Sequence, residues 1–194
     1  MRVRTRRPAF IDSIAIALSL LFLIPASASA HQRQLLQIGA TDYLVVVGFV
    51  NEPVYTGDKS GVELIIITPD PANPLDSRAP EAEPVEALEK SLKVEVKAGP
   101  HTKVFDLKPA YRAPGRYEAV FYPTVPTTYT FRFFGMVHDV PVDLTFICNP
   151  LGHVSDEDRT VLKLSQDVTR KVLIGSFGCP QERAEAEFPP RRTQ

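Results

Sequence analysis

The chain has 194 residues, with 22 basic and 23 acidic side chains, a formal net charge of −1 and two cysteines. After its first 30 residues it shows no basic patch and no run of Lys or Arg interleaved with aromatic residues, which argues against nucleic-acid binding. The length that follows the first 30 residues suits one domain with its own core.

Residues 1–30 have the pattern of a secretory signal peptide. Four arginines precede an apolar run from Ile14 to Ile24, and Ala28-Ser29-Ala30 is a small-x-small cleavage site. The run is too short for a membrane span, which needs about 20 residues. We therefore expect export to the periplasm or the extracellular space, a mature chain that begins at His31, and no membrane span after processing.

The first half of the mature chain predicts three strands and a long connection. Residues 32–38 suit a first edge strand, and the run 43–50 (YLVVVGFV) is apolar on both faces, as expected for a central strand. A β-branched strand over 62–68 follows. Pro69 to Glu86 is rich in proline and acidic residues and lacks apolar periodicity, so it predicts a solvated connection.

The second half predicts a meander. A hairpin over 91–107 turns at Gly99-Pro100-His101. From Pro114 to Cys148 three strands alternate apolar and polar residues, which is the period of a strand with one buried face. Their predicted inward residues are Tyr117, Ala119 and Phe121; Tyr129, Phe131 and Phe133; and Val140, Val142, Leu144, Phe146 and Cys148.

Beyond Cys148 the pattern is weaker. Ser155, followed by three acidic residues, predicts a short helix through about Leu164, because the serine can cap it and the acids suit its first turn. Residues 168–174 predict a last strand, and 181–194 a disordered tail. About eight short strands predict an all-β, immunoglobulin-like two-sheet sandwich over residues 31–180.

The two cysteines, Cys148 and Cys179, predict a disulfide. An exported chain meets an oxidising compartment, and an even pair is most simply a bridge. A thiolate metal site is the alternative, although the spacing of the two residues matches no zinc pattern.

No catalytic residue is assigned, because the chain lacks the G-x-S-x-G, H-E-x-x-H, P-loop and G-x-G-x-x-G patterns. Chemistry could instead reside in four histidines: His31, His101, His138 and His153. As the first mature residue, His31 would offer its α-amine and a ring nitrogen to one ion. With a second His these would form a planar three-nitrogen set, which favours Cu(II).

Strand counting leaves the second ligand open. If strands alternate between the two ends of the sandwich, His101 and His153 lie at one end and His138 at the other. A tight reversal at Gly39 would place His31 with His101 and His153, whereas one continuous strand over 32–50 would place it near His138. Each histidine could equally be a plain surface residue.

The layout resembles small exported bacterial immunoglobulin-like domains, namely the CopC-type periplasmic copper proteins and the YtkA-like and FixH-like domains. The resemblance is carried by His31, Pro114-Gly115-Arg116-Tyr117, Thr128-Tyr129-Thr130-Phe131 and the V-P-V run that begins at Val140. It implies an Asp and a His just before the Pro-Val pair. Here the nearest candidates are His138-Asp139, in reversed order, and Met136 is the only methionine of the mature chain.

Three functions remain open at this stage. The first is a non-catalytic exported domain that binds or handles copper. The second is a metal-free structural or interaction module whose partner is an envelope protein. The third is a copper-brace oxidase of the kind that cleaves polysaccharides, although the chain has no tryptophan for a flat glycan-binding surface.

Overall fold

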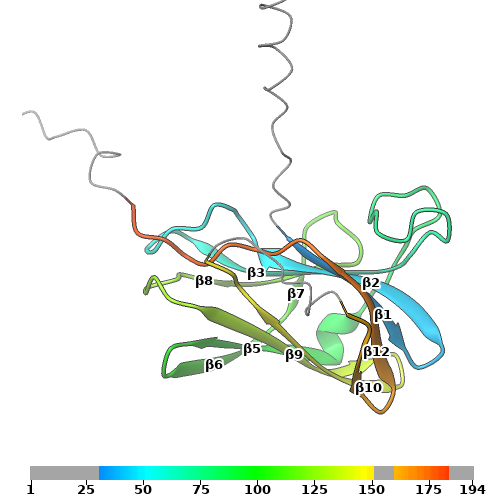
Figure 1. Ribbon diagram of the computed structural model, residues 1–194. Coiled ribbons are helices and arrows are strands. Elements are labelled where there is room, and N and C mark those ends of the chain that lie inside the picture. The colour runs from blue at the N-terminus through cyan, green and yellow to red at the C-terminus, as the bar shows by residue number, and fades with distance from the viewer. Residues whose placement is uncertain (1–30, 151–159, 184–194) are drawn as a thin grey trace, which may run out of the picture.

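A computed structural model describes residues 31–150 and 160–183. Two antiparallel sheets face each other as the upper and lower layers of Figure 1. The large sheet has the order β11-β12-β1-β2-β3-β8-β7, with β4 beside β3, and the small sheet has the order β10-β9-β5-β6. The predicted all-β, two-sheet sandwich is therefore confirmed.

Most strand bounds follow the expected elements closely, whereas the short strands β4, β7 and β11 were not predicted. In the large sheet they are β1 (Gln32–Ile38), β2 (Thr41–Phe49), β3 (Ser60–Thr68), β4 (Glu83–Pro84), β7 (Lys108–Pro109), β8 (Arg116–Phe121), β11 (Leu162–Ser165) and β12 (Val168–Ile174). In the small sheet they are β5 (Leu92–Ala98), β6 (His101–Asp106), β9 (Tyr129–Val137) and β10 (Val140–Ile147). A 3₁₀ turn, η2 (Leu88–Lys90), precedes β5.

The core lies between the sheets and is filled by the alternating residues of the Pro114–Cys148 meander. Buried as predicted are Tyr117 and Ala119 of β8, Tyr129, Phe131 and Phe133 of β9, and Val142, Leu144 and Phe146 of β10. The predicted inward residues Phe121 and Val140 are only partly buried against this core. Phe49 of β2 meets Phe131 edge-to-face with ring centroids 5.0 Å apart, and Phe131 stacks on Phe177 at 5.4 Å. Each such ring contributes about 1.5–3 kcal/mol through burial.

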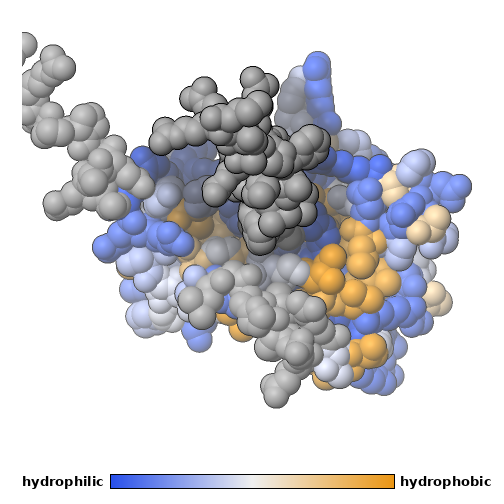
Figure 2. All heavy atoms as spheres, turned by 45° about the horizontal axis from the view of Figure 1, so that its top comes forward, coloured by the Kyte–Doolittle hydropathy of each residue, from blue (hydrophilic) through white to orange (hydrophobic). Residues whose placement is uncertain are grey.

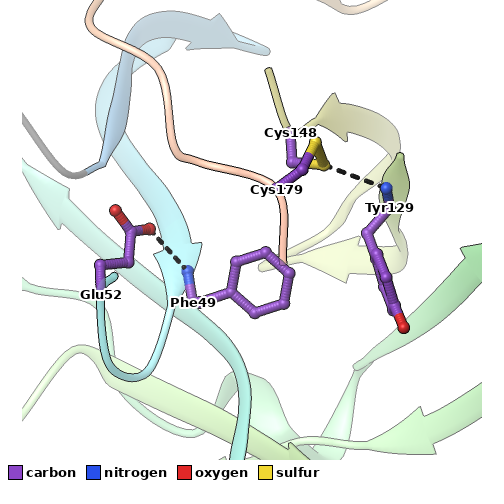
Figure 3. Close-up of a disulfide and its surroundings, with 5 residues drawn as sticks. All are labelled: Phe49, Glu52, Tyr129, Cys148 and Cys179. Carbon is purple, nitrogen blue, oxygen red and sulfur yellow. Dashed lines mark hydrogen bonds between the residues drawn. A yellow bond between two sulfur atoms is a disulfide. The ribbon is translucent and has the colours of Figure 1, made fainter. Parts of the chain in front are cut away.

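The predicted disulfide between Cys148 and Cys179 is present. It connects the residue after β10 in the small sheet to the segment that follows β12 in the large sheet, so it joins the two layers (Figure 3). The backbone N–H of Tyr129 donates to Cys148 Sγ at 3.0 Å, which anchors the bridge to β9.

The prediction that residues 32–38 form an edge strand is wrong. β1 lies between β2 and β12, because the last strand returns to pair with the first along Arg33↔Ile174 to Ile38↔Val168. A sequence shows the apolar period of a strand but not which distant strand will pair with it.

The prediction of a helix through Leu164 is also wrong where it can be compared. Residues 155–159 lie outside the described residues, but Leu162–Ser165 forms β11, a hairpin partner of β12. Pairing with an existing strand outweighs the helix-start signal of the preceding acidic residues. The prediction of disorder over 181–194 is wrong for its first residues, since Gln181 bridges to Tyr55 and Arg183 pairs with Asp58. Residues 184–194 lie outside the described residues.

Candidate functional site

The outer face of β2 and β3 in the large sheet is partly covered by the segment that the sequence predicted to be a solvated connection. Leu44, Val46 and Ile67 point away from the main core and are nevertheless buried, because Leu75 and Ala82 of that segment pack over them. The solvated interpretation of Pro69–Glu86 holds for most of its residues, which are exposed, but it is wrong at Asp70, Ala79 and Val85, which are buried. Because β2 and β3 have apolar residues on both faces, both faces must be packed against other residues. Pro69–Glu86, which we call the covering segment, packs against the outer face.

Asx turns give the covering segment its shape. Asp70 Oδ1 accepts the backbone N–H of Ala72 at 2.7 Å, and Asp76 Oδ1 accepts that of Arg78 at 2.9 Å. Such turns let aspartate replace a backbone partner. Asp70 is only 3 % exposed, so the segment has buried polar anchors as well as apolar ones.

His31 lies on this same outer face, at the start of β1. Its Nε2 is 3.0 Å from Glu63 Oε2 on β3, and the two side chains are 23 % and 6 % exposed. Beneath the ring is Gly48 of β2, where an added Cβ would be 2.5 Å from His31 Cδ2. Only a residue without a side chain leaves room for the imidazole there.

Glu63 is held between two basic side chains. Its Oε2 faces His31, and its Oε1 is 3.2 Å from Nη1 of Arg116, which comes from the neighbouring strand β8. A carboxylate this buried is costly unless charged donors satisfy both oxygens. The three side chains therefore form one polar cluster on a mostly apolar face.

A cavity of about 300 Å³ opens beside this cluster. Its walls come from the sheet and from the covering segment; the polar lining residues are His31, Arg33, Glu63, Asp76, Ser77, Arg78 and Arg116. Figure 2 turns this side of the molecule toward the viewer and shows hydrophilic and hydrophobic areas side by side on it.

Glu52, in the turn after β2, is a second acidic group near the cluster. Its Oε1 accepts the backbone N–H of Phe49 at 3.1 Å (Figure 3). Burial raises its pKa from 4.5 to about 7, against the lowering effects of that hydrogen bond and of the charge of His31, while the charge of Glu63 adds to the rise.

The structure answers the question of where His31 lies. Gly39 makes a tight reversal with φ of 61°, so β1 and β2 form a hairpin and residue 31 returns beside Gly48. That is the end at which β6 begins with His101. His138 lies in the β9–β10 hairpin at the other end, with its ring 6.2 Å from that of Tyr43.

The predicted metal residues are therefore distributed over different surfaces. His31 belongs to the outer face of the large sheet, His101 to the small sheet, and His138 to the opposite end, while His153 lies outside the described residues. Within residues 31–150 and 160–183, no three His, Cys, Asp or Glu side chains gather closely enough to hold a metal ion.

Sequence reasoning missed Glu63, Arg116 and Gly48 as parts of a site. A signal for Glu63 was available: it is the only charged residue in the run VELIIIT, where neighbours on both faces are apolar. An acid in such a strand is buried and needs a cationic partner. Nothing comparable identifies Gly48, whose role depends on the return of the chain at Gly39.

Comparison with protein-family models, with curated proteins and with solved structures found no significant match. In the part of the chain that the structure describes, no helix has the length and apolar character needed to cross a membrane.

Proposed function

We propose that the protein is an exported, non-catalytic domain that binds one Cu(II) ion through His31 after residues 1–30 have been removed. The observation that supports this function is the position of the His31 ring, which lies above Gly48 and has its Nε2 next to the Glu63 carboxylate. An ordinary surface histidine does not require a glycine beneath its ring or a buried carboxylate beside it. The presence of both at His31 supports a functional role for this residue.

The chemistry follows from the two ring nitrogens. Only Nδ1 is close enough to the residue's own α-amine to share an ion with it in a chelate. Nε2 is 3.0 Å from Glu63 Oε2, so in this proposal Nε2 is the ring nitrogen that carries the proton and Nδ1 is the one that would bind copper. Bound copper would supply Lewis-acid or redox character, and the contribution of the chain is to fix the orientation and tautomer of the ligand ring.

The test is calorimetric titration of the processed protein, beginning at His31, with Cu(II) in a buffer that contains glycine as competitor. We expect one bound ion per chain, and the His31→Ala variant should bind at least about 100-fold more weakly. Glu63→Gln should weaken binding by about tenfold, the usual effect of losing a partner of a ligand histidine.

His138→Ala is the matched control, since it removes a histidine at the far end of the sandwich and should leave affinity unchanged. Acetylation of the His31 α-amine should match the loss seen in His31→Ala. The function is ruled out if His31→Ala retains the affinity and stoichiometry of the unaltered protein, or if the latter binds no copper.

The alternative is a metal-free interaction module of the cell envelope. A separate feature, the open side of the sandwich between β6 and β8, favours it as a second role.

A further inference from the structure

The two sheets separate along one side of the sandwich and leave a groove there. β6 is the last strand of the small sheet, and β8 faces it from the large sheet, where β7 pairs only with Glu118 and Tyr117 among the described residues. Between them is a cavity of about 580 Å³, which we call the β6–β8 groove. Its principal lining residues are His101, Lys103, Phe105, Val120, Phe121 and Tyr122.

The backbone of β6 offers a free edge. Within the described residues this strand pairs with β5 alone, from Lys93↔Asp106 to Ala98↔His101. Every residue of β6 except Phe105 is exposed. The outer row of N–H and C=O groups of such a strand can accept one further strand.

The floor of the groove is aromatic. The rings of Phe105 and Phe121 are 5.6 Å apart, and Phe121 stacks on Tyr129 at 6.2 Å with an interplanar angle of 11°. Val120 and Tyr122 continue this surface and are 48 % and 58 % exposed. Exposed apolar surface of this kind, bordered by polar residues, is typical of interaction sites.

The charge of the groove selects the partner. Lys103 and His101 occupy the β6 positions opposite Val96 and Ala98, which belong to the face that points toward the other sheet. Lys103 Nζ lies 4.9 Å from the centroid of Phe105. Among the described residues that line the groove there is no carboxylate, so an acidic partner is favoured and a basic one is repelled.

The same charge argues against a second copy of this chain as occupant. An antiparallel β6–β6 pair centred near Lys103 would place two lysines opposite each other, which destabilises a sheet. A lysine on an edge strand is a known device against self-pairing.

We propose that the β6–β8 groove binds an extended segment of a partner protein that contains acidic and apolar residues. The segment adds to β6 as a further antiparallel strand, with an apolar side chain against Phe105 and acidic side chains opposite Lys103 and His101. This inference uses neither His31 nor copper, so it stands or falls independently of the proposed metal site.

The test uses a synthetic peptide whose order follows the antiparallel register, acetyl-Phe-Val-Glu-Val-Glu-amide, and its counterpart with lysine in place of glutamate. Backbone amide NMR signals of the processed protein are recorded during titration. We expect the glutamate peptide to shift signals of residues 101–106 and 119–122, and the lysine peptide to bind at least about tenfold more weakly.

Lys103→Glu should reverse this preference, so that the lysine peptide binds more tightly than the glutamate peptide. Lys97→Glu is the matched control: it makes the same charge change on β5, outside the groove, and should leave the preference unchanged. The inference is wrong if neither peptide shifts these signals, if both bind equally, or if Lys103→Glu has no effect. Dimerisation of the protein alone through β6, seen by sedimentation, would also overturn it.

Discussion

The outer faces of the two sheets obey the same alternation rule but are used differently. On the small sheet, outward residues are exposed or half-buried, and some pair with each other, as Arg132 does with Asp143 at 2.6 Å and Lys93 with Asp106 at 2.9 Å. On the large sheet, Leu44 and Val46 also point outward, yet they are at most 3 % exposed under the covering segment. A polar residue on the outer face of the small sheet is solvated. A polar residue under the covering segment of the large sheet is buried and therefore needs polar partners.

The disulfide joins the sheets that carry these two faces, and its loss should have the largest effect. Replacing both Cys148 and Cys179 with alanine removes the constraint on a loop of sequence separation 31. The free energy of unfolding should fall by about 3–4 kcal/mol because the unfolded chain gains freedom. Urea unfolding measures this, and a loss below about 1 kcal/mol would show that the sheets hold together without the bridge.

Replacing one apolar residue by alanine on the outer face of each sheet tests whether the covered outer face of the large sheet is a second hydrophobic core. Leu44→Ala should lower the free energy of unfolding by about 2–4 kcal/mol, since Leu44 is 0 % exposed. Ile147→Ala on the small sheet should cost about 0.5 kcal/mol or less, because Ile147 is 54 % exposed. Equal losses in chemical denaturation would contradict the distinction between the faces.

Two carboxylates, one buried and one exposed, test whether the two outer faces also differ in how much an ion pair stabilises them. Glu63→Gln leaves Arg116 and His31 facing a neutral amide in a buried place and should cost about 2 kcal/mol. Asp143→Asn breaks an exposed pair and should cost about 0.5 kcal/mol. The two losses of stability are compared from the midpoints of guanidinium unfolding curves at neutral pH. A larger loss for Asp143→Asn than for Glu63→Gln would contradict the expected contrast.

The smallest effect concerns pH and Glu52. Its pKa of about 7 in the folded protein exceeds the ordinary 4.5, so the folded state binds the proton more tightly. Stability from this group is complete below about pH 4.5 and declines as pH rises toward about 7, by about 1 kcal/mol after allowance for solvent screening. In the metal-free protein, Glu52→Gln should reduce the decline of the free energy of unfolding between about pH 4.5 and about pH 7. An unchanged decline would show that another group causes it.

The sequence predicted the three-strand meander well, in which β8 belongs to the large sheet and β9 and β10 belong to the small sheet. The strands β8, β9 and β10 have one buried and one polar face, and strict alternation showed which residues of each point inward. The bridge from Cys148 to Cys179 was also predictable, because an exported chain with two cysteines has one simple pairing.

The large-sheet side was less predictable, because its features depend on contacts between distant segments. The apolar residues on both faces of β2 indicated two covers, but not that Leu75 would be part of one. The placement of His31 depended on a single turn at Gly39, and the internal position of β1 depended on the return of β12. The predicted copper site and export signal stay predictions.

The pairing of β1 with β12 also determines when the fold can be completed. The first strand that the structure describes is bonded on one side to its immediate successor and on the other to nearly the last described segment. Contacts of such long sequence separation slow folding, since a long loop must close before they form. A chain that ends before Val168 would leave β1 with an open edge, so the large sheet is completed only after β12 has been synthesised.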